Sequence, residues 1–220
     1  MLLAPVAVIP LGLLVALVLW AGRSLNLAAF PVAVLGIGAL ALGSRAFHLD
    51  GLSDTADGLT ASYDRERSLA VMKSGSAGPA GVVAIVVVLG VQVGSLAALV
   101  AVPGGPLLAA FLICASRASL ALACLAGVPA ARTSGLAVSY AGTIPRWLAS
   151  LIWLVAVGLS TYAFRLAGFD LWRGPVAMLA GAFVVALLLI RCVRRFGGVT
   201  GDVFGAGIEL CLAVMLLAST

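Results

Sequence analysis

Charged side chains are scarce in this sequence. Of its 220 residues only 10% are Asp, Glu, Lys or Arg, with eight acids and one histidine, whereas 63% are hydrophobic. The mean hydropathy is +1.23. A soluble domain of this size saturates its core long before it reaches such an apolar content. The composition therefore excludes an ordinary soluble protein and indicates a polytopic α-helical membrane protein.

Apolar runs follow one another along the chain between short polar breaks. A helix needs about 20 mostly apolar residues to cross a hydrocarbon core of roughly 30 Å. The first run has neither the basic start nor the small-residue cleavage site of a signal peptide, so we interpret it as a span. The sequence predicts one all-α, membrane-embedded domain over residues 1–220. About seven membrane spans are predicted: Leu3–Trp20, Ala28–Phe47, Pro79–Val102, Pro106–Val128, Trp147–Phe164, Pro175–Ile190 and Val203–Ala218.

Paired cysteines and an exposed basic domain are also missing. The four cysteines fall in predicted spans without a C-x-x-C pair, so we interpret them as small apolar fillers rather than disulfides or a zinc site. The net charge of +5 favours contact with the lipid bilayer or with an anionic substrate. No basic domain is present to hold nucleic acid, and the sequence leaves the oligomeric state open.

The few basic residues are unevenly distributed. The loops after the second, fourth and sixth predicted spans share one side of the membrane, which the positive-inside rule places in the cytoplasm. Six of the eight acids fall in the same loops. The sequence thus predicts a phosphate-handling active site on the cytoplasmic side. The loops hold nine of the thirteen basic residues: Arg45, Arg65, Arg67, Lys73, Arg132, Arg146, Arg191, Arg194 and Arg195.

Three acids are concentrated in the stretch His48-Leu-Asp-Gly-Leu-Ser-Asp-Thr-Ala-Asp-Gly58. If this stretch is helical, Asp50, Asp54 and Asp57 lie at i, i+4 and i+7 on one face. Carboxylates this close together repel one another unless a cation neutralises them. Mg²⁺ takes oxygen ligands and shares its coordination shell with substrate phosphates. The spacing favours a magnesium site over a solvated acidic loop. His48 is an interfacial donor, a metal ligand or a phosphate contact, and the sequence does not rank these roles.

A second constellation is Arg194-Arg-Phe-Gly-Gly-Val-Thr-Gly-Asp202, continuing to Glu209. Its glycines free backbone N–H groups just before a predicted helix start, which favours anion binding. Asp202 and Glu209 are seven residues apart and share a helical face. The alternative is an ordinary basic flank with a glycine turn. Glu209 argues against it, because an acid within a span is costly and usually faces a cavity or a partner.

Two further features remain open from the residues alone. Arg117 lies in the middle of the fourth predicted span, where an inward-facing arginine pairs with a carboxylate or phosphate, or forms a structural ion pair. The segment Ser74-Gly-Ser-Ala-Gly78 is either a phosphate-binding loop or the entry to the third span.

At these residues the sequence resembles the adenosylcobinamide-GDP ribazoletransferases, also called cobalamin synthases. The block His48–Gly58 matches the family signature almost residue for residue, and the resemblance covers roughly residues 10 to 218. Two departures stand out. Family members usually begin with a further basic segment, which favours a truncated or misassigned start here, and Ser74–Gly78 replaces a more usual Asp-Ser-Arg-x-Gly. Further matches are Asp64-Arg-Glu-Arg67, Met72-Lys-Ser74, Gly78, Gly81, Arg117, Ala131–Leu136 and Gly197–Ala206 with Glu209.

The resemblance implies a bacterial or archaeal inner-membrane enzyme of vitamin B12 assembly. In the implied reaction, a hydroxyl of α-ribazole or its phosphate attacks the cobinamide-side phosphorus of adenosylcobinamide-GDP, and GMP leaves. Phosphoryl transfer relies on cations that spread charge over the reacting oxygens. The implied Mg²⁺ ligands are Asp50, Asp54 and Asp57, with one of them or His48 in a catalytic role, while Asp202 and Glu209 hold a second metal or a ribose. The implied phosphate contacts are Arg117, Arg132, Arg195, Lys73, Gly197, Gly198 and Thr200.

Two other functions remain in competition. A CDP-alcohol phosphotransferase also gathers aspartates at a helix end, but it spaces them differently and places Ala-Arg after the first Asp-Gly. A transporter would line a path through the membrane midplane with its charges. Most acids here cluster at one interface instead.

Overall fold

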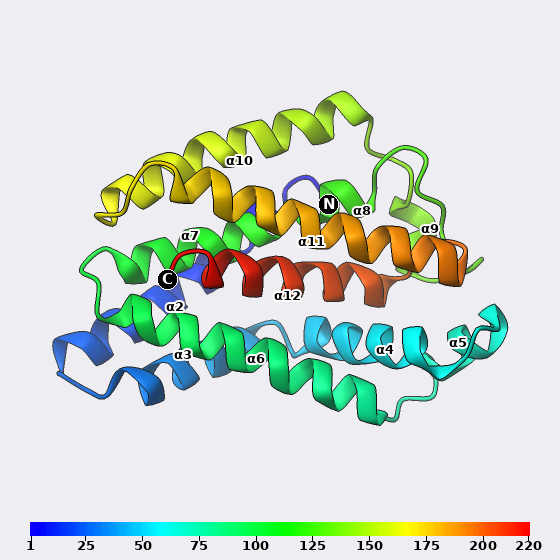
Figure 1. The fold of residues 1–220 in the computed structure, drawn as a ribbon, viewed down its shortest axis with the longest axis horizontal. Coiled ribbons are helices and arrows are strands. Elements are labelled where there is room, and N and C mark those ends of the chain that lie inside the picture. The colour runs from blue at the N-terminus through cyan, green and yellow to red at the C-terminus, as the bar shows by residue number, and fades with distance from the viewer.

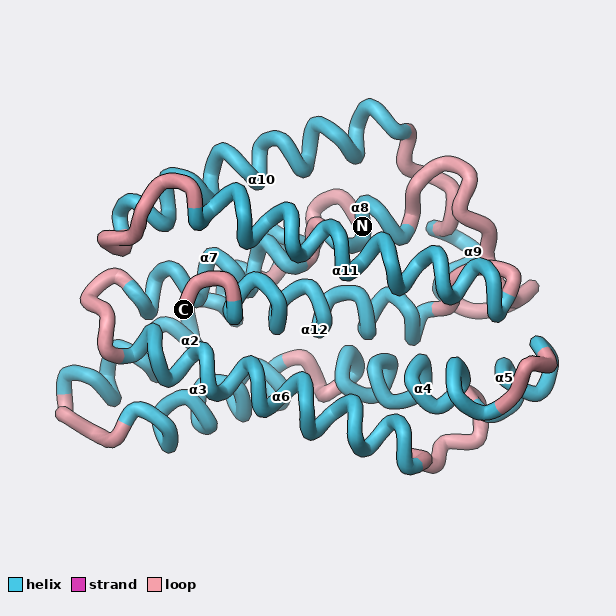
Figure 2. The backbone as a smooth tube through the Cα atoms, in the orientation of Figure 1, coloured by secondary structure: helices cyan, strands magenta, loops and turns pink.

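The computed structural model describes residues 1–220. The chain is helical throughout and has no strand, only two isolated bridges, Leu125 with Ile144 and Ala130 with Val199 (Figure 2). The predicted all-α class is confirmed. The helices are α1 (Ala4–Ala7), α2 (Ile9–Ser24), α3 (Ala29–Gly43), α4 (Phe47–Ala61), α5 (Arg65–Val71), α6 (Pro79–Val100), α7 (Gly105–Ser116), α8 (Ser119–Ala123), α9 (Leu136–Tyr140), α10 (Arg146–Leu166), α11 (Arg173–Phe196) and α12 (Gly201–Leu217).

Four helical segments are long and apolar enough to cross a membrane: α6, α7 together with α8, α10 and α11. The bent pair α3–α4 makes a fifth if it counts as one span, and α2 is a shorter apolar helix. The protein is therefore a helical membrane protein. The count of about seven spans stays a prediction, because three of the apolar runs form helices that are short or broken.

The second predicted span is interrupted by a sharp bend. Helices α3 and α4 meet at 89°, and Arg45 and Ala46 between them both adopt positive φ, at 55° and 56°. This left-handed conformation is uncommon for residues with a side chain. Because of this bend, α4 does not continue along the axis of α3. Helix α4, which carries the acidic residues, packs instead against α12.

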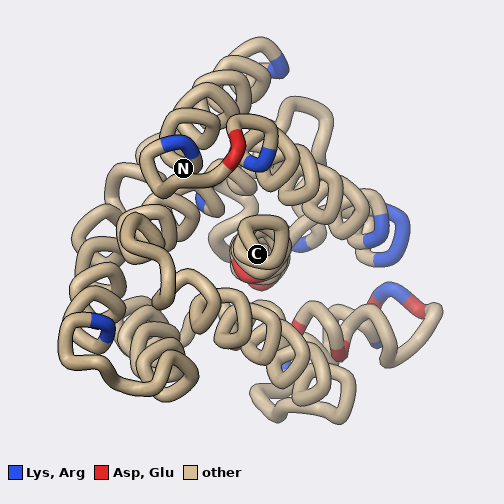
Figure 3. The backbone as a smooth tube through the Cα atoms, turned by 60° about the vertical axis from the view of Figure 1, so that its left-hand side comes forward, with Lys and Arg blue, Asp and Glu red and all other residues tan.

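Helix α12 occupies the middle of the bundle. It packs against α4, α6, α7, α8 and α11, and the end view in Figure 3 shows the C-terminus surrounded by other helices. Most of its side chains are buried, among them Leu212, Met215 and Leu216. The residues at its N-terminal end are thereby held against α4.

Most connections between helices gather at two ends of the molecule, and the α3–α4 bend lies between these ends (Figure 1). One end carries α5, α9 and the loops on either side of them. The opposite end carries the C-terminus and the short α2–α3, α6–α7 and α10–α11 turns. Most of the predicted site residues follow or precede loops at the first end, which agrees with the grouping of loops expected from the sequence.

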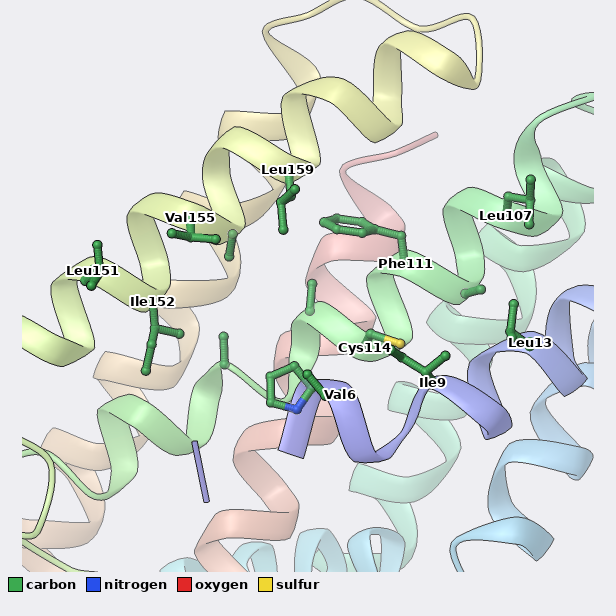
Figure 4. Close-up of a pocket in the computed structure, with 15 residues that line it drawn as sticks. Val6, Ile9, Leu13, Leu107, Phe111, Cys114, Leu151, Ile152, Val155 and Leu159 are labelled. Carbon is green, nitrogen blue, oxygen red and sulfur yellow. The ribbon is translucent and has the colours of Figure 1, made fainter. Parts of the chain in front are cut away.

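An apolar groove of about 640 Å³ lies between α1–α2, α7–α8 and α10 (Figure 4). Ile9, Phe111 and Ile152 line it, and all but one of its fifteen lining residues are hydrophobic. It contains no charged side chain that could bind a phosphate or a metal. The groove is therefore not a candidate for the chemistry that the acidic residues predict.

Candidate active site

The site is built on close packing between α4 and α12. Two glycines permit it: a Cβ on Gly51 would lie 2.6 Å from the Asp202 carbonyl oxygen, and one on Gly205 would lie 3.0 Å from the Cα of His48. Real Cβ atoms do not approach backbone as closely as 2.6 Å, so Gly51 requires glycine, and at Gly205 a side chain would force the neighbouring backbone to shift. The two contacts also show that α4 and α12 run antiparallel, with the start of α4 beside Gly205.

This packing brings Asp50, Asp54 and Asp202 together. The Asp54 carboxylate is repelled by the negative charges of Asp50, Asp202 and Asp57, and it is attracted by the positive charge of Arg132. Arg132 also lies 3.7 Å from the Asp202 carboxylate, measured from Nη1 to Oδ2. Asp50 is exposed, and Asp54 and Asp202 are half-buried. Asp54 thus lies close enough to Asp50, Asp57 and Asp202 to interact with their charges, and the predicted convergence of these acids around a metal stays a prediction.

The glycine turn before α12 positions Asp202 and Arg132. Gly197 ends α11 with φ of 74°, and the Val199 N–H donates to the Pro129 carbonyl while its own carbonyl accepts from Ala131. These bonds fix the 129–132 segment beside the turn. The Arg132 Nη2 then donates to the Leu69 carbonyl at 3.0 Å. The arginine is thus held by backbone on one side and by Asp202 on the other.

A cavity of about 220 Å³ lies at this N-terminus of α12. Thr200 caps the helix by accepting the Val203 N–H, and its hydroxyl donates to Asp202 at 3.1 Å. A helix N-terminus attracts anions through its free N–H groups and its dipole. Arg132 supplies a fixed cation on the cavity wall. The cavity has the chemistry of a phosphate pocket.

Asp57 has a different environment. It is buried, and its two carboxylate oxygens accept the backbone N–H groups of Gly78 at 2.7 Å and Gly81 at 2.8 Å. These amides belong to the N-terminal turn of α6, where an aspartate is favourable. Asp57 therefore ties α4 to α6 and to the loop before it. Its assignment as a magnesium ligand stays a prediction.

Glu209 is held in a second polar cluster deeper in the bundle. Its Oε2 accepts from Gln92 Nε2 at 2.8 Å, and its Oε1 lies 3.6 Å from His48 Nδ1. Seven residues of helix separate it from Asp202, about 10 Å along the axis. The structure therefore joins Glu209 to His48 of the acidic stretch but not to the cluster around Asp54. A metal role for Glu209 likewise stays a prediction.

The remaining predicted phosphate contacts are dispersed. Lys73 is exposed and makes no ion pair. Arg195 stacks over the Tyr63 ring at 4.2 Å and donates to the Leu59 carbonyl at 3.4 Å, beside the end of α4. Gly198 packs on the 129–131 backbone. Arg117 is buried next to the second cluster rather than next to Asp54.

Sequence reasoning missed two residues that build the site. Gln92, the only glutamine in the chain, lies within an apolar run, which was a usable signal. Arg65 donates to the Ala131 carbonyl at 3.0 Å and packs on Gly197, so it braces the turn that carries Arg132. Arg65 entered the sequence analysis only as a basic loop residue and as part of the Asp64–Arg67 match, because nothing local distinguishes a bracing arginine from a solvated one.

The donor chemistry of the acids around Asp54 would suit Mg²⁺. Asp50, Asp54 and Asp202 offer only carboxylate oxygens, and Arg132 alone is too little charge to balance them. The protein has no group of three His, Cys, Asp or Glu side chains arranged around one point. Mg²⁺ is usually held by one or two carboxylates together with waters and substrate phosphates, so this arrangement fits an ion that binds jointly with its substrate.

A helical membrane protein with an aspartate, a fixed arginine and a helix N-terminus around one cavity, and with further acids on the adjacent α4, defines a class: membrane-embedded enzymes that act on phosphorylated substrates. The family comparison makes this class specific. The chain matches the cobalamin-5-phosphate synthase family model over residues 1–220, and it belongs to that family of transferases.

Curated relatives agree with the family model. A Nocardioides protein named adenosylcobinamide-GDP ribazoletransferase is 52% identical over 218 residues, which cover 99% of this chain and 85% of the relative. Relatives of the same name from Frankia casuarinae and Pseudomonas paraeruginosa are 35% and 42% identical over 99% and 80% of this chain, which is 83% and 68% of their own lengths. No solved structure matches the chain.

Proposed function

We propose that this protein is an adenosylcobinamide-GDP ribazoletransferase that completes the nucleotide loop of cobalamin. A ribose hydroxyl of α-ribazole, or of its phosphate, attacks the cobinamide-side phosphorus of adenosylcobinamide-GDP. A new P–O bond forms, the pyrophosphate bond breaks, and GMP leaves with the bridging oxygen. The observation that carries the proposal is the whole-chain match to the family, because the matched residues include the acidic cluster on α4 and α12.

The residues around the 220 Å³ cavity suit this transfer. Arg132 and the N-terminus of α12 bind the pyrophosphate of the donor, and the cavity wall at Thr200 orients it. Asp50, Asp54 and Asp202 would hold Mg²⁺, which when bound would spread the charge of the phosphate oxygens. One of these carboxylates accepts the proton of the attacking hydroxyl. Asp57 keeps the α6 N-terminus and the preceding loop against α4, beneath the site.

The same proposal includes an orientation in a bacterial or archaeal inner membrane. The end of the molecule that carries α5 and α9 also carries most of the basic loop residues, so the positive-inside rule assigns it to the cytoplasm. Multi-pass insertion with this orientation gives the site direct access to nucleotide substrates.

A single assay tests the reaction. Purified protein in lipid nanodiscs is given adenosylcobinamide-GDP, α-ribazole and Mg²⁺, and GMP and cobalamin are followed by chromatography and mass spectrometry. We expect equal amounts of both products, and omission of α-ribazole should abolish both. Folded protein that releases no GMP would overturn the proposal, as would turnover of a CDP-alcohol in its place.

A further inference from the structure

A second polar cavity, of about 400 Å³, lies between the N-terminal helices, the α3–α4 bend and α8. It is distinct from the cavity beside Asp202, but both border the α4–α12 pair. His48 lines it two residues before Asp50 on α4, and Ile208 lines it next to Glu209 on α12. Its apolar wall comes from Ala4, Val8, Leu11 and Leu120.

Arg117 lines this cavity and is only 3% exposed. Its Nη1 donates to the Ile113 carbonyl at 2.8 Å and to the Ser116 hydroxyl at 2.9 Å. Its Nη2 is buried and has no hydrogen-bond partner. The two ion pairs of the protein are His48 with Glu209 and Arg132 with Asp202, so Arg117 has no carboxylate within 4 Å.

A buried arginine without a counter-ion is strongly unfavourable in a membrane protein, and charged residues within spans usually face the bundle interior or a cavity and mark substrate pathways. Glu209 is the nearest source of negative charge, but Gln92 already occupies one of its oxygens and His48 lies beside the other. The His48 Nδ1 also lacks a hydrogen bond. The residues around this cavity thus include one unpaired cationic donor, Arg117 Nη2, beside an apolar wall, which suits a ligand with an apolar body and one anionic group.

The proposed reaction supplies such a ligand. The family is described as cobalamin-5-phosphate synthase, so its product keeps a phosphate that is not transferred. The cavity at Arg132 is needed for the donor pyrophosphate, and a phosphorylated acceptor needs another cation. Along α12, Ile208 in this cavity and Asp202 in the other are six residues apart, about 9 Å along the helix axis, a separation on the scale of one nucleotide.

Resting on the proposed function, we infer that Arg117 binds the untransferred phosphate of α-ribazole phosphate, with the benzimidazole ring on the apolar wall. The protein then distinguishes a phosphorylated acceptor from free α-ribazole by a residue outside the phosphoryl-transfer site. The headgroup phosphate of an anionic lipid has the same chemistry and is the competing occupant.

The first test compares the two acceptors in neutral phosphatidylcholine nanodiscs. For Arg117→Gln we expect kcat/KM with α-ribazole phosphate to fall about 10- to 100-fold, the range of a lost charged hydrogen bond. The change should lie in KM, and kcat/KM with α-ribazole should stay within about twofold. Arg165→Gln, an exposed arginine at the opposite end, is the matched control. Equal losses with both acceptors would overturn the inference.

A rim variant keeps the test independent of the folding of Arg117→Gln. Ala7 is exposed and lines the cavity, so Ala7→Glu places a negative charge there without disturbing the core. We expect Ala7→Glu to weaken only the phosphorylated acceptor, and the uncharged Ala7→Gln to weaken neither. Selective loss with Ala7→Glu supports the inference, and an unchanged preference overturns it.

Direct binding without Mg²⁺ separates the two phosphate sources. Calorimetry should show that wild-type protein binds α-ribazole phosphate more tightly than α-ribazole, and that short-chain phosphatidylglycerol does not displace it. Displacement by the lipid would assign the cavity to a headgroup and overturn the inference. Wild-type protein that binds the acceptor with this preference but turns over neither acceptor would contradict the proposed function instead.

Discussion

Asp54 is the residue on which the acidic cluster acts most directly. Asp50, Asp57 and Asp202 repel its charge, and Arg132 attracts it. We predict that Asp54→Asn lowers the rate of GMP release about 100-fold or more, the range seen when a preorganised electrostatic group is removed. In Mg²⁺-free buffer its unfolding temperature should not fall, because a repulsive charge has been removed.

The Mg²⁺ dependence of stability distinguishes a ligand from a bystander. An ion that binds only the folded state stabilises it by RT ln(1 + [Mg²⁺]/Kd), so wild-type protein should melt higher as Mg²⁺ rises. Asp54→Asn should lose most of this shift, and Asp170→Asn, at the opposite end of the molecule, should retain it. An undiminished shift in Asp54→Asn would remove Asp54 from the ion site.

Asp57 should behave differently, because its oxygens accept the Gly78 and Gly81 amides. We predict that Asp57→Asn destabilises the protein by about 1–3 kcal/mol, since the amide nitrogen cannot accept a hydrogen bond and leaves a buried donor unpaired. Amide hydrogen exchange should accelerate across residues 73–82, and Mg²⁺ should still raise the unfolding temperature. Loss of that rise with unchanged exchange would make Asp57 a metal ligand after all.

The residue types of the site were readable from the sequence, but their partners were not. The spacing of Asp50, Asp54 and Asp57 predicted one helical face, and α4 confirms the helix. Along that face, however, exposure falls from Asp50 to Asp57. The contact of Asp57 with α6 depends on how two helices cross, and a sequence pattern of one helix carries no information about that angle.

At the scale of elements, the α4–α12 contact depends on glycine. We predict that Gly51→Ala destabilises the protein by about 1–3 kcal/mol, the usual cost of overpacking, because its Cβ would lie 2.6 Å from the Asp202 carbonyl oxygen. Separation of the two helices should also reduce the rise in unfolding temperature that Mg²⁺ causes. Stability can be followed by unfolding in SDS.

Gly38→Ala is the matched control for this change. Gly38 is also helical, in α3, and a Cβ there meets nothing within 4 Å. Alanine is favoured over glycine in a helix by about 0.5–1 kcal/mol, so this variant should be neutral or slightly stabilised. Equal stability of Gly51→Ala and Gly38→Ala would show that α4 and α12 are not packed closely at Gly51.

The elements themselves were partly predictable. Apolar runs located α6, α10 and α11. The short helix α5 contains no such run and begins after Asp64, which caps it by accepting the Arg67 N–H at 2.7 Å. The α3–α4 bend was not foreseen. Arg45 and Ala46 carry no local signal for positive φ, and only the surrounding packing determines that conformation.

For the whole molecule, the proposed orientation makes a labelling prediction. With Cys114, Cys124, Cys192 and Cys211 replaced by alanine, a cysteine at exposed Ser74 should resist a membrane-impermeant maleimide in intact cells and react after lysis. A cysteine at exposed Asp170, at the opposite end, should react in intact cells. The reverse pattern would place the site outside the cytoplasm.

The central position of α12 has a consequence for biosynthesis. A chain is made from its N-terminus, so α12 leaves the ribosome after α4, α6, α7, α8 and α11, the helices that enclose it. Until α12 is made, those helices lack the central helix on which they pack. Gln92 and His48 also lack their partner Glu209. We therefore expect the packed core to form only after α12 has been made, and a nascent chain stalled before residue 201 to remain open to proteolysis.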